Sequence, residues 1–495
     1  MKLILPKLLL RALLLHGTQV AAAFPWARNE VRNIDTRSLP TVVLDEDIVQ
    51  RGSSTMTSDR DKNDLGRFYG IDMSDNGQYV IAVENNGSTD DNKLHIYEWN
   101  ESDDKYDLLQ YIEFEYGSRS ACRCAVSGNG KFIAYSDPRY SIPTLDDVGR
   151  SEVWQFNEVT NKFDILVGEA QGNKRREKTG AGEHAFSQDG SKLFIGDGTQ
   201  FEDVSGKARF DVYIFDEGND QFDLTSPSYT IYDPNGDERL GGTISVSGDG
   251  NRFIAGNYYI ETAYIFALDD TGNTYQLVGT PLTGNENTSD DFGAHVAISL
   301  DGNVVVCADA YYNNYVGALF IYQLDGAEYN LIDTVFGDAA GGRLGQRVEV
   351  SDNGDFIFAS SPYAGDRYSG KVNIYCRVSS QSSTTYEKCN TIEESIIYTN
   401  FGDNMVLKNN YVAIWSQSEN TQAKRGKITV FEGLPITSTV ASTLPSEKPS
   451  DKSSDVPSIN PSMSSPKPSS VSNSPTELTL LPEPFILPPP VALLI

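Results

Sequence analysis

Ser74-Asp75-Asn76-Gly77 is a tight-turn sequence that returns five more times along this 495-residue chain, at intervals of 52 to 60 residues. The other copies are Ser127-Gly128-Asn129-Gly130, Ser187-Gln188-Asp189-Gly190, Ser247-Gly248-Asp249-Gly250, Ser299-Leu300-Asp301-Gly302 and Ser351-Asp352-Asn353-Gly354, and a degenerate seventh copy is Lys408-Asn409-Asn410-Tyr411. Asn-Gly and Asp-Gly supply the positive φ angles that a tight β-hairpin needs. Six clean copies at a near-constant interval indicate a repeat architecture in which every unit contains a hairpin.

Each turn is followed by the same order of elements. A buried strand, such as residues 79–83, comes directly after the turn, and a third strand ends on an aromatic residue, as in Phe320-Ile321-Tyr322. More polar segments, such as residues 106–111, fit a fourth strand. Seven units of four strands without helical periodicity predict an all-β fold, a seven-bladed β-propeller of four-stranded antiparallel blades. One blade cannot bury both of its faces alone, so the units must stack around a ring.

The two ends of the repeat region predict how the ring closes. The units cover residues 41–434, and the seventh ends after its third strand at Phe431-Glu432-Gly433. The chain before the first unit offers an unassigned strand at residues 41–45, Thr-Val-Val-Leu-Asp. We expect this N-terminal strand to complete the last blade, because the pairing removes an exposed sheet edge.

The termini predict a secreted protein. Residues 1–23 have the charged, apolar and small-residue order of a signal peptide, and residues 24–40 form a linker. In residues 436–477, 25 of 42 residues are Ser, Thr or Pro, which predicts a disordered and O-glycosylated stalk over residues 435–477. The apolar tail at residues 478–495 carries five prolines, so we expect no transmembrane helix there, although a glycolipid-anchor signal would fit.

Charge and cysteine usage fit an extracellular protein. The chain has 69 acidic and 40 basic residues, a formal charge of −29 that argues against nucleic acid as a partner. Sequons at Asn86, Asn100 and Asn287 are expected glycosylation sites. Cys376 and Cys389 flank a polar loop, and we expect them to form a disulfide in an oxidising compartment. The cysteine count of five is odd, so at least one is free or pairs between chains.

An aromatic residue or Leu followed by Gly precedes most of the turns. The pairs are Leu65-Gly66, Tyr116-Gly117, Leu240-Gly241, Phe292-Gly293, Leu344-Gly345 and Phe401-Gly402. With Gly317-Ala318 before a third strand, this pattern resembles the FG-GAP repeat of integrin α-subunit heads and of many secreted or surface proteins. The resemblance implies a propeller that takes part in adhesion. The acidic calcium loop of integrin blades is missing from every unit, so the resemblance does not extend to calcium binding.

Two sets of residues are candidates for binding. A polar row on the inner strands is expected to lie near the central channel, and it holds Asp72, Arg123, Glu183, His295, Arg347, Glu349 and Asn404. His184 falls in the apolar row and is expected to pack. Tyrosine clusters that contain Tyr259, Tyr312, Tyr315 and Tyr363 follow the second strands of three successive units. We therefore expect these clusters to crowd one face of the ring.

No catalytic motif accompanies these residues. The chain has no G-x-S-x-G, H-E-x-x-H or P-loop sequence and no C-x-x-C pair for zinc, so we predict no catalytic residues, no cofactor and no metal site beyond weak calcium binding by acidic loops. The preferred function is binding or adhesion, with a glycan or an extracellular protein as partner. The alternative is a propeller-fold carbohydrate-active enzyme with its site at the central channel.

Overall fold

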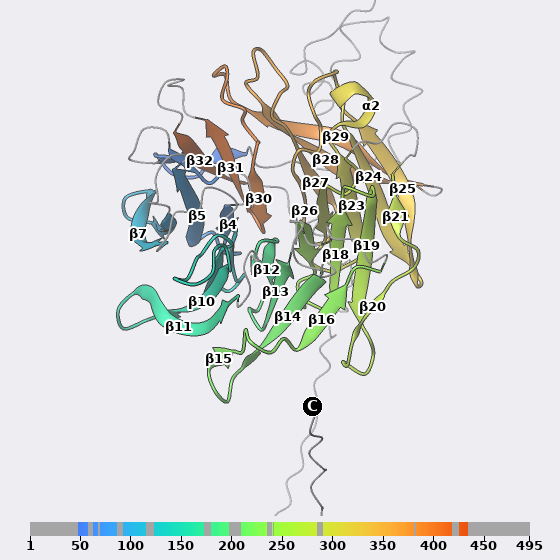
Figure 1. Cartoon of the computed structure of the whole chain (residues 1–495). Helices are drawn as coiled ribbons and strands as arrows, with labels where there is room; N and C mark the ends of the chain where they lie inside the picture. The colour runs from blue at the N-terminus through green and yellow to red at the C-terminus, as the bar shows by residue number, and fades with distance from the viewer. Residues whose placement is uncertain are drawn as a thin grey trace, which may run out of the picture. The chain divides into compact units, whose positions relative to one another are not determined.

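A computed structural model describes residues 48–433 except 58–62, 68–69, 87–92, 115–122, 173–179, 198–208, 235–239, 241, 285–290, 381–382 and 418–424. Seven antiparallel sheets follow one another around a ring in chain order, which confirms the predicted seven-bladed β-propeller (Figure 1). The expected signal peptide, linker, stalk and tail lie outside the described residues, as does Asn287.

The first three blades contain fourteen of the described strands. Blade 1 consists of β3 (Asn63–Leu65), β4 (Ile71–Met73), β5 (Tyr79–Asn86), β6 (Lys93–Asn100) and β7 (Lys105–Glu113). Blade 2 consists of β8 (Arg123–Val126), β9 (Phe132–Asp137), β10 (Arg150–Asn157) and β11 (Lys162–Gln171). Blade 3 consists of β12 (His184–Phe186), β13 (Lys192–Asp197), β14 (Arg209–Asp216), β15 (Gln221–Phe222) and β16 (Tyr229–Tyr232). In blade 3 the outermost strand is split, because β15 and β16 both pair with β14.

The next three blades repeat this order. Blade 4 consists of β17 (Thr243–Val246), β18 (Arg252–Asn257), β19 (Thr262–Leu268), β20 (Tyr275–Leu277) and β21 (Leu282–Thr283). Blade 5 consists of β22 (His295–Ile298), β23 (Val304–Asp309), the short turn α2 (Tyr312–Tyr315), β24 (Ala318–Asp325) and β25 (Glu328–Phe336). Blade 6 consists of β26 (Val348–Val350), β27 (Phe356–Ser361), β28 (Lys371–Ser379) and β29 (Thr384–Glu393).

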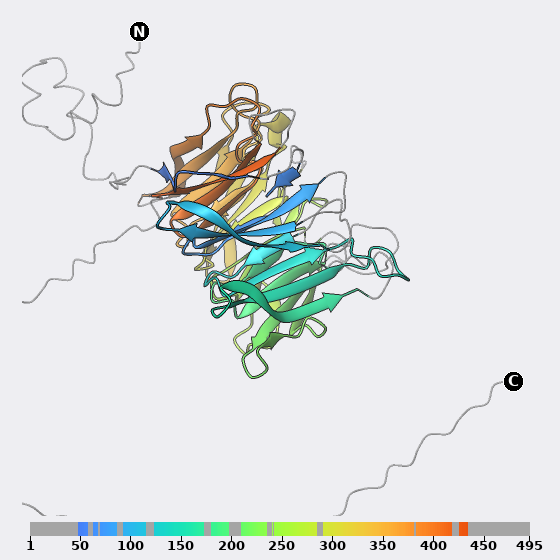
Figure 2. The same cartoon turned by 90° about the vertical axis from the view of Figure 1, so that its left-hand side faces the viewer.

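The seventh blade joins the two ends of the ring. It consists of β30 (Met405–Lys408), β31 (Tyr411–Gln417), β32 (Gly426–Glu432), β1 (Val49–Gln50) and β2 (Met56–Thr57). Both N-terminal strands pair antiparallel with β32, so an N-terminal segment closes the ring as expected (Figure 2). The closing strands are β1 and β2, whereas residues 41–45, where we expected the closure, lie outside the described residues.

Arg51 fixes this closure between the last and the first blade. Its guanidinium lies 4.2 Å from the ring centre of Trp99 in blade 1 and 4.3 Å from that of Tyr411 in blade 7. It also donates a hydrogen bond of 2.9 Å to the carbonyl oxygen of Gly77. Cation–π contacts of this kind contribute more when they are shielded from water, and Arg51 is only 8% exposed.

The side chains of the repeated turn explain its sequence. In the first copy the Ser74 hydroxyl accepts a hydrogen bond from the Tyr79 amide (3.0 Å) and donates one to the Asn76 carboxamide oxygen (2.9 Å). The same pair of bonds recurs in the other five clean copies. Only the glycine, such as Gly77 with φ of +62°, takes the left-handed conformation, so Ser and Asn or Asp build the rest of the turn.

The turns also bind one another around one rim of the ring, which we name the turn rim. From blade 1 to blade 6, a main-chain hydrogen bond joins the turn of each blade to the turn of the next blade. The donor and acceptor pairs are Asp75 to Gly128, Asn129 to Gln188, Gln188 to Gly248, Gly248 to Leu300, and Asp301 to Asp352. The seventh blade joins the first through a side chain, because the Asn409 amide donates to the Asp75 carbonyl at 3.0 Å.

The hydrophobic core is divided among the junctions between blades. Seven clusters of buried side chains occur, one at each of the seven junctions. Five of the residues that precede Gly lie in these clusters and have no exposed surface, namely Leu65, Leu240, Phe292, Leu344 and Phe401. Each blade therefore depends on its neighbours for the burial of both faces, as the repeat pattern predicted.

Two further features of the fold are relevant to function. The structure joins Cys376 to Cys389 by a disulfide between β28 and β29, and it buries the side chains of Cys124 and Cys307. The described part of the chain contains no helix that is long and apolar enough to cross a membrane.

Candidate binding sites on the loop rim and in the channel

The rim opposite the turns, which we name the loop rim, carries the connections between the second and third strands of the blades. The predicted tyrosine clusters all occupy such connections, β18 to β19, β23 to β24 and β27 to β28. The repeat topology therefore places them on one side of the ring. In Figure 1 the turn α2, which contains Tyr312 and Tyr315, lies at the end of the strands in blade 5.

Arg343 is the centre of the tyrosine cluster between blades 5 and 6. Its guanidinium lies 4.9 Å from the ring centre of Tyr311, 5.1 Å from that of Tyr315 and 4.4 Å from that of Tyr363. Tyr363 also packs edge-to-face on Tyr368, with 5.8 Å between ring centres. Three different connections thus meet around one cation, and the rings are held at fixed positions rather than left free to rotate.

The backbone of these connections is constrained as well. Eight non-glycine residues of the cluster have positive φ angles, namely Asn313, Asn314, Tyr315, Arg343, Arg367, Tyr368, Tyr398 and Asn400. Left-handed backbone is unfavourable for residues with a Cβ and persists only where neighbouring contacts enforce it. Here the contacts are hydrogen bonds between connections, from the Arg343 amide to the Tyr315 carbonyl at 2.9 Å and from the Asn400 amide to the Tyr368 carbonyl at 3.0 Å.

Glycines lock the connections of neighbouring blades together. Gly317 of blade 5 lies against the backbone of Leu344 in blade 6, and Gly370 of blade 6 lies against Phe401 in blade 7 in the same way. A Cβ at either glycine would collide with the backbone of the next blade. This contact gives the aromatic-Gly or Leu-Gly pair of one blade a defined partner in the blade before it.

The four predicted tyrosines differ in what they present to solvent. Tyr259 is 60% exposed and Tyr315 is 43% exposed, whereas Tyr363 is partly covered by Arg343. Tyr312 packs inward, with its ring 6.0 Å from Phe320 and 5.4 Å from Phe336 between centres. The ring of Tyr312 therefore packs the connection from β23 to β24 against blade 5.

Two residues of the loop rim were not expected from the sequence. Arg343 lies in the connection from β25 to β26, outside the predicted tyrosine clusters, so nothing pointed to it. Tyr398 is 43% exposed and extends the aromatic surface beyond the predicted clusters, whereas Tyr368, which is 52% exposed, belongs to the predicted cluster at residues 363–368. Their left-handed conformations depend on hydrogen bonds from other loops, which a linear sequence does not reveal.

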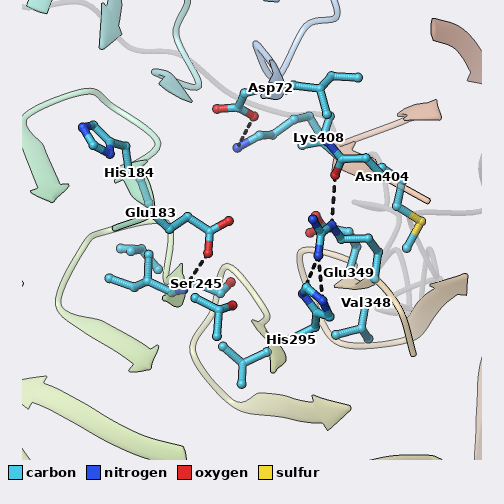
Figure 3. Close-up of a pocket in the computed structure, with 18 of the residues that line it drawn as sticks. Asp72, Glu183, His184, Ser245, His295, Val348, Glu349, Asn404 and Lys408 are labelled. Atoms are coloured by element: carbon cyan, nitrogen blue, oxygen red, sulfur yellow. Dashed lines mark hydrogen bonds and ion pairs between the residues drawn. The ribbon is translucent and has the colours of Figure 1, made fainter. Parts of the chain in front are cut away.

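The second candidate site is a cavity of about 150 Å³ in the central channel (Figure 3). Its lining includes six residues of the predicted polar row and also Lys408; the six are Asp72, Glu183, His295, Arg347, Glu349 and Asn404. Arg123 is buried nearby, and its charge acts on Glu183 and His295. His184 is 5% exposed and its Nδ1 lies 3.0 Å from the Gly182 carbonyl, and burial lowers its pKa to about 4, so it packs as a neutral imidazole.

Part of the polar row binds the inner strands to one another. The carboxylate of Asp72 in blade 1 accepts the Val126 amide of blade 2 at 2.8 Å, and Glu183 of blade 3 accepts the Ile244 amide of blade 4 at 2.8 Å. Ser245 of blade 4 accepts an amide of blade 5 at 3.1 Å. These side chains bind backbone amides of the neighbouring inner strand, because the described inner strands of separate sheets have no backbone hydrogen bonds with one another.

On the opposite side of the channel, side chains from blades 5, 6 and 7 contact one another in series. The Arg347 guanidinium lies 2.7 Å from the imidazole of His295 and donates to the Asn404 side chain at 3.0 Å. Burial lowers the pKa of His295 well below its usual value, and the positive charges of Arg347 and Arg123 lower it further. His295 is therefore a neutral partner of Arg347 at physiological pH.

Lys408 and Glu349 face this cavity from adjacent blades. Lys408 occupies the position of the repeated Ser in the seventh turn, and its ammonium lies 3.6 Å from the Asp72 carboxylate. The replacement of the repeated Ser by Lys was the feature of the sequence that could have identified Lys408 as a channel residue. Burial raises the pKa of Glu349 to about 8, and the negative charges of Asp72 and Glu183 add to this effect.

Two of the remaining predicted residues, Asn86 and Asn100, lie at the ends of strands of blade 1. Asn100 ends β6 in a turn, where its amide donates to Asp107 at 2.8 Å, and Asn86 is the last residue of β5. Within the described ranges, no group of three or more His, Cys, Asp or Glu side chains is arranged to hold a metal ion. The acidic loops proposed for weak calcium binding fall partly outside those ranges.

Comparisons with known proteins identify no relative by sequence. No family model matches the chain, and no curated protein matches it. The FG-GAP resemblance therefore stays a prediction.

Similar folds occur among solved structures. The β-propeller domain of Cps50 (Swd1) from Myceliophteria thermophila has a TM-score of 0.48 at 10% identity and covers 77% of this chain and 99% of that chain. A putative 6-phosphogluconolactonase from Bacteroides uniformis has a TM-score of 0.45 at 12% identity, covering 68% and 91%. The periplasmic gluconolactonase PpgL from Pseudomonas aeruginosa has a TM-score of 0.44 at 11% identity, covering 72% and 96%. At such identities the likeness concerns the fold alone.

Proposed function

We propose that this chain is a secreted or cell-surface binding protein whose loop rim binds a glycan without turnover. The observation that carries the proposal is the arrangement of tyrosine rings around Arg343, because it joins three loops into one fixed surface. The signal-like N-terminus, the sequons and the Ser/Pro-rich segment of the sequence support a location outside the cell.

The chemistry of the surface favours a sugar as ligand. A tyrosine ring offers a flat apolar face for the C–H face of a sugar and a hydroxyl group for hydrogen bonds. Tyr315, Tyr368 and Tyr398 present such rings, and the exposed Asn313 and Asn314 side chains add carboxamide groups beside Tyr315. Alternating apolar faces and polar groups match the alternating C–H and hydroxyl surfaces of a saccharide.

The rigidity of the surface favours binding over catalysis. Tyrosine contributes contact area with few rotatable bonds, so little side-chain entropy is lost when a ligand is bound. The hydrogen bonds between loops and the stacking on Arg343 fix the rings before a ligand arrives. A site assembled in this way gains affinity from preorganisation.

The proposal can be tested with a double variant, Tyr315→Ala with Tyr368→Ala, in the secreted protein. Both rings are exposed, so their loss leaves the core intact. We expect the wild type to bind a defined class of oligosaccharide on a glycan array, and the variant to lose at least about tenfold in affinity, because each stacked ring contributes roughly 1 kcal/mol or more. The thermal midpoint should change little.

The matched control is Tyr232→Ala. Tyr232 is 51% exposed on β16, in the outermost part of blade 3 and away from the Arg343 cluster. This variant should bind the same oligosaccharides as the wild type. Failure of the wild type to bind any glycan, or equal binding by the double variant, would reject the proposal.

A further inference from the structure

Three inner strands carry a polar side chain two residues before the repeated Ser, and one of the three differs from the other two. Asp72 and Ser245 both stand two residues before the repeated Ser, and both accept an amide of the next blade. Glu349 stands at the same position in blade 6, yet no hydrogen bond or ion pair joins its side chain to the other described residues. Its carboxyl group lines the cavity and is left for another partner.

The charges of the channel are arranged in layers. Arg123 and Arg347 stand four residues before the repeated Ser of their blades, at the end of the channel toward the loop rim. Asp72 and Glu349 stand two residues before it, and Asp75 and Asp352 lie in the turns themselves. Glu183 also stands four residues before its Ser, so the loop end carries two guanidinium groups and one carboxylate, whereas the turn end carries an excess of carboxylates around Lys408.

Two titratable groups respond to this arrangement of charges. The pKa of His295 is lowered by burial and by Arg347 and Arg123, so the field at the loop end is positive. Burial would lower the pKa of Lys408, but Asp72, Asp75 and Glu349 outweigh it and raise the pKa, so the field at the turn end is negative. A ligand with a positive and a negative group would lie along this field.

We propose that the channel binds a small zwitterion of the size of an amino acid, with its carboxylate toward Arg347 and its ammonium group toward Glu349. The cavity of about 150 Å³ sets the size, since an apolar cavity of similar volume accommodates a benzene molecule. A simple cation would leave the guanidinium end unmatched, and a simple anion would leave the carboxylate end unmatched. The channel site is separate from the loop rim and does not depend on glycan binding.

The position of Glu349 gives the proposal a pH dependence. Its carboxyl group faces Lys408 of β30, Asp72 of β4, Glu183 beside β12 and Arg347 on its own blade. With a pKa of about 8 it is mostly protonated at neutral pH, and a bound ammonium group favours the ionised form. Binding therefore releases a proton, and affinity should rise between about pH 6 and pH 8.

The experiment uses the whole secreted chain and the twenty standard amino acids, each added at millimolar concentration in a thermal-shift assay. The amino acid that stabilises the protein most is then compared by calorimetry with its amide, which lacks the carboxylate, and with its N-acetyl derivative, which lacks the ammonium group. We expect both derivatives to bind at least about tenfold more weakly than the amino acid.

Two variants localise the site. Glu349→Gln should weaken binding at least about tenfold and abolish its rise with pH, because the amide cannot ionise. Glu387→Gln, an exposed residue on β29 of the same blade, should bind like the wild type. The proposal is overturned if no amino acid stabilises the protein, if either derivative binds as tightly as its parent, or if Glu349→Gln binds like the wild type.

Discussion

The two rims of the propeller are built by different rules. On the turn rim, the same Ser, Asn or Asp, and Gly residues recur, and main-chain hydrogen bonds link successive turns. On the loop rim of blades 5 to 7, the connections differ in length and sequence, and left-handed tyrosines and a central Arg343 hold them in place. The repeated residues set the architecture, and the irregular connections create a surface that no other described part of the ring repeats.

The ring closure tests the comparison most strongly, because a side-chain hydrogen bond replaces the main-chain bond of the turn rim between blades 7 and 1. Removal of residues 48–57 deletes β1 and β2, uncovers the edge of β32 and takes Arg51 from between Trp99 and Tyr411. We expect a loss of roughly 4 to 5 kcal/mol in the free energy of unfolding, measured by urea denaturation. Deletion of residues 25–40 is the control, and an equal loss in both would show that β1 and β2 add nothing.

The loop rim can be broken at a single glycine. Gly317→Ala places a methyl group against the Leu344 backbone and also strains a φ of +84°. Gly326→Ala strains a φ of +65° but meets no atom within 4 Å. We expect the first variant to lose about 3 kcal/mol and the second about 1 kcal/mol in chemical denaturation, since only the first combines strain with a clash. Equal losses would mean that the contact between blades is not tight.

We expect the smallest loss of stability from a substitution on the turn rim. Asn409→Gly removes the side-chain hydrogen bond to the Asp75 carbonyl but retains the left-handed backbone, which has a φ of +47° at Asn409. A loss of about 1 kcal/mol relative to Asn410→Gly is expected, because one hydrogen bond contributes that much. Thermal denaturation of both variants would measure the difference, and no difference would mean that this bond does not help to close the rim.

The fold could be predicted because its determinants are local and repeated. The turn is held by hydrogen bonds within six residues, such as those of Ser74 with Asn76 and Tyr79. Because these bonds are local, they require the same residues at the same spacing in each clean copy of the turn. The closing strands β1 and β2 have two residues each, too short for an alternating pattern, and this is why the closure was expected at residues 41–45 instead.

The sites could be predicted only in part. His295, Arg347 and Glu349 follow from strand periodicity, which assigns them to the channel side, but the partners of each come from other blades. Tyrosine richness was the weaker guide, because several tyrosines have a structural role. Tyr106, Tyr275 and Tyr386 donate hydrogen bonds of 2.5 to 2.7 Å to the glycine carbonyl of the turn in their own blade.

The pairing of Val49 with Glu432 sets an order on biosynthesis. The segment that closes the ring is made first and its partner strand almost last, so during synthesis β1 and β2 have no sheet to join. Contacts of such long range slow folding and leave edges of finished blades open to wrong partners in the meantime. The ring can therefore close only after β32 has been made.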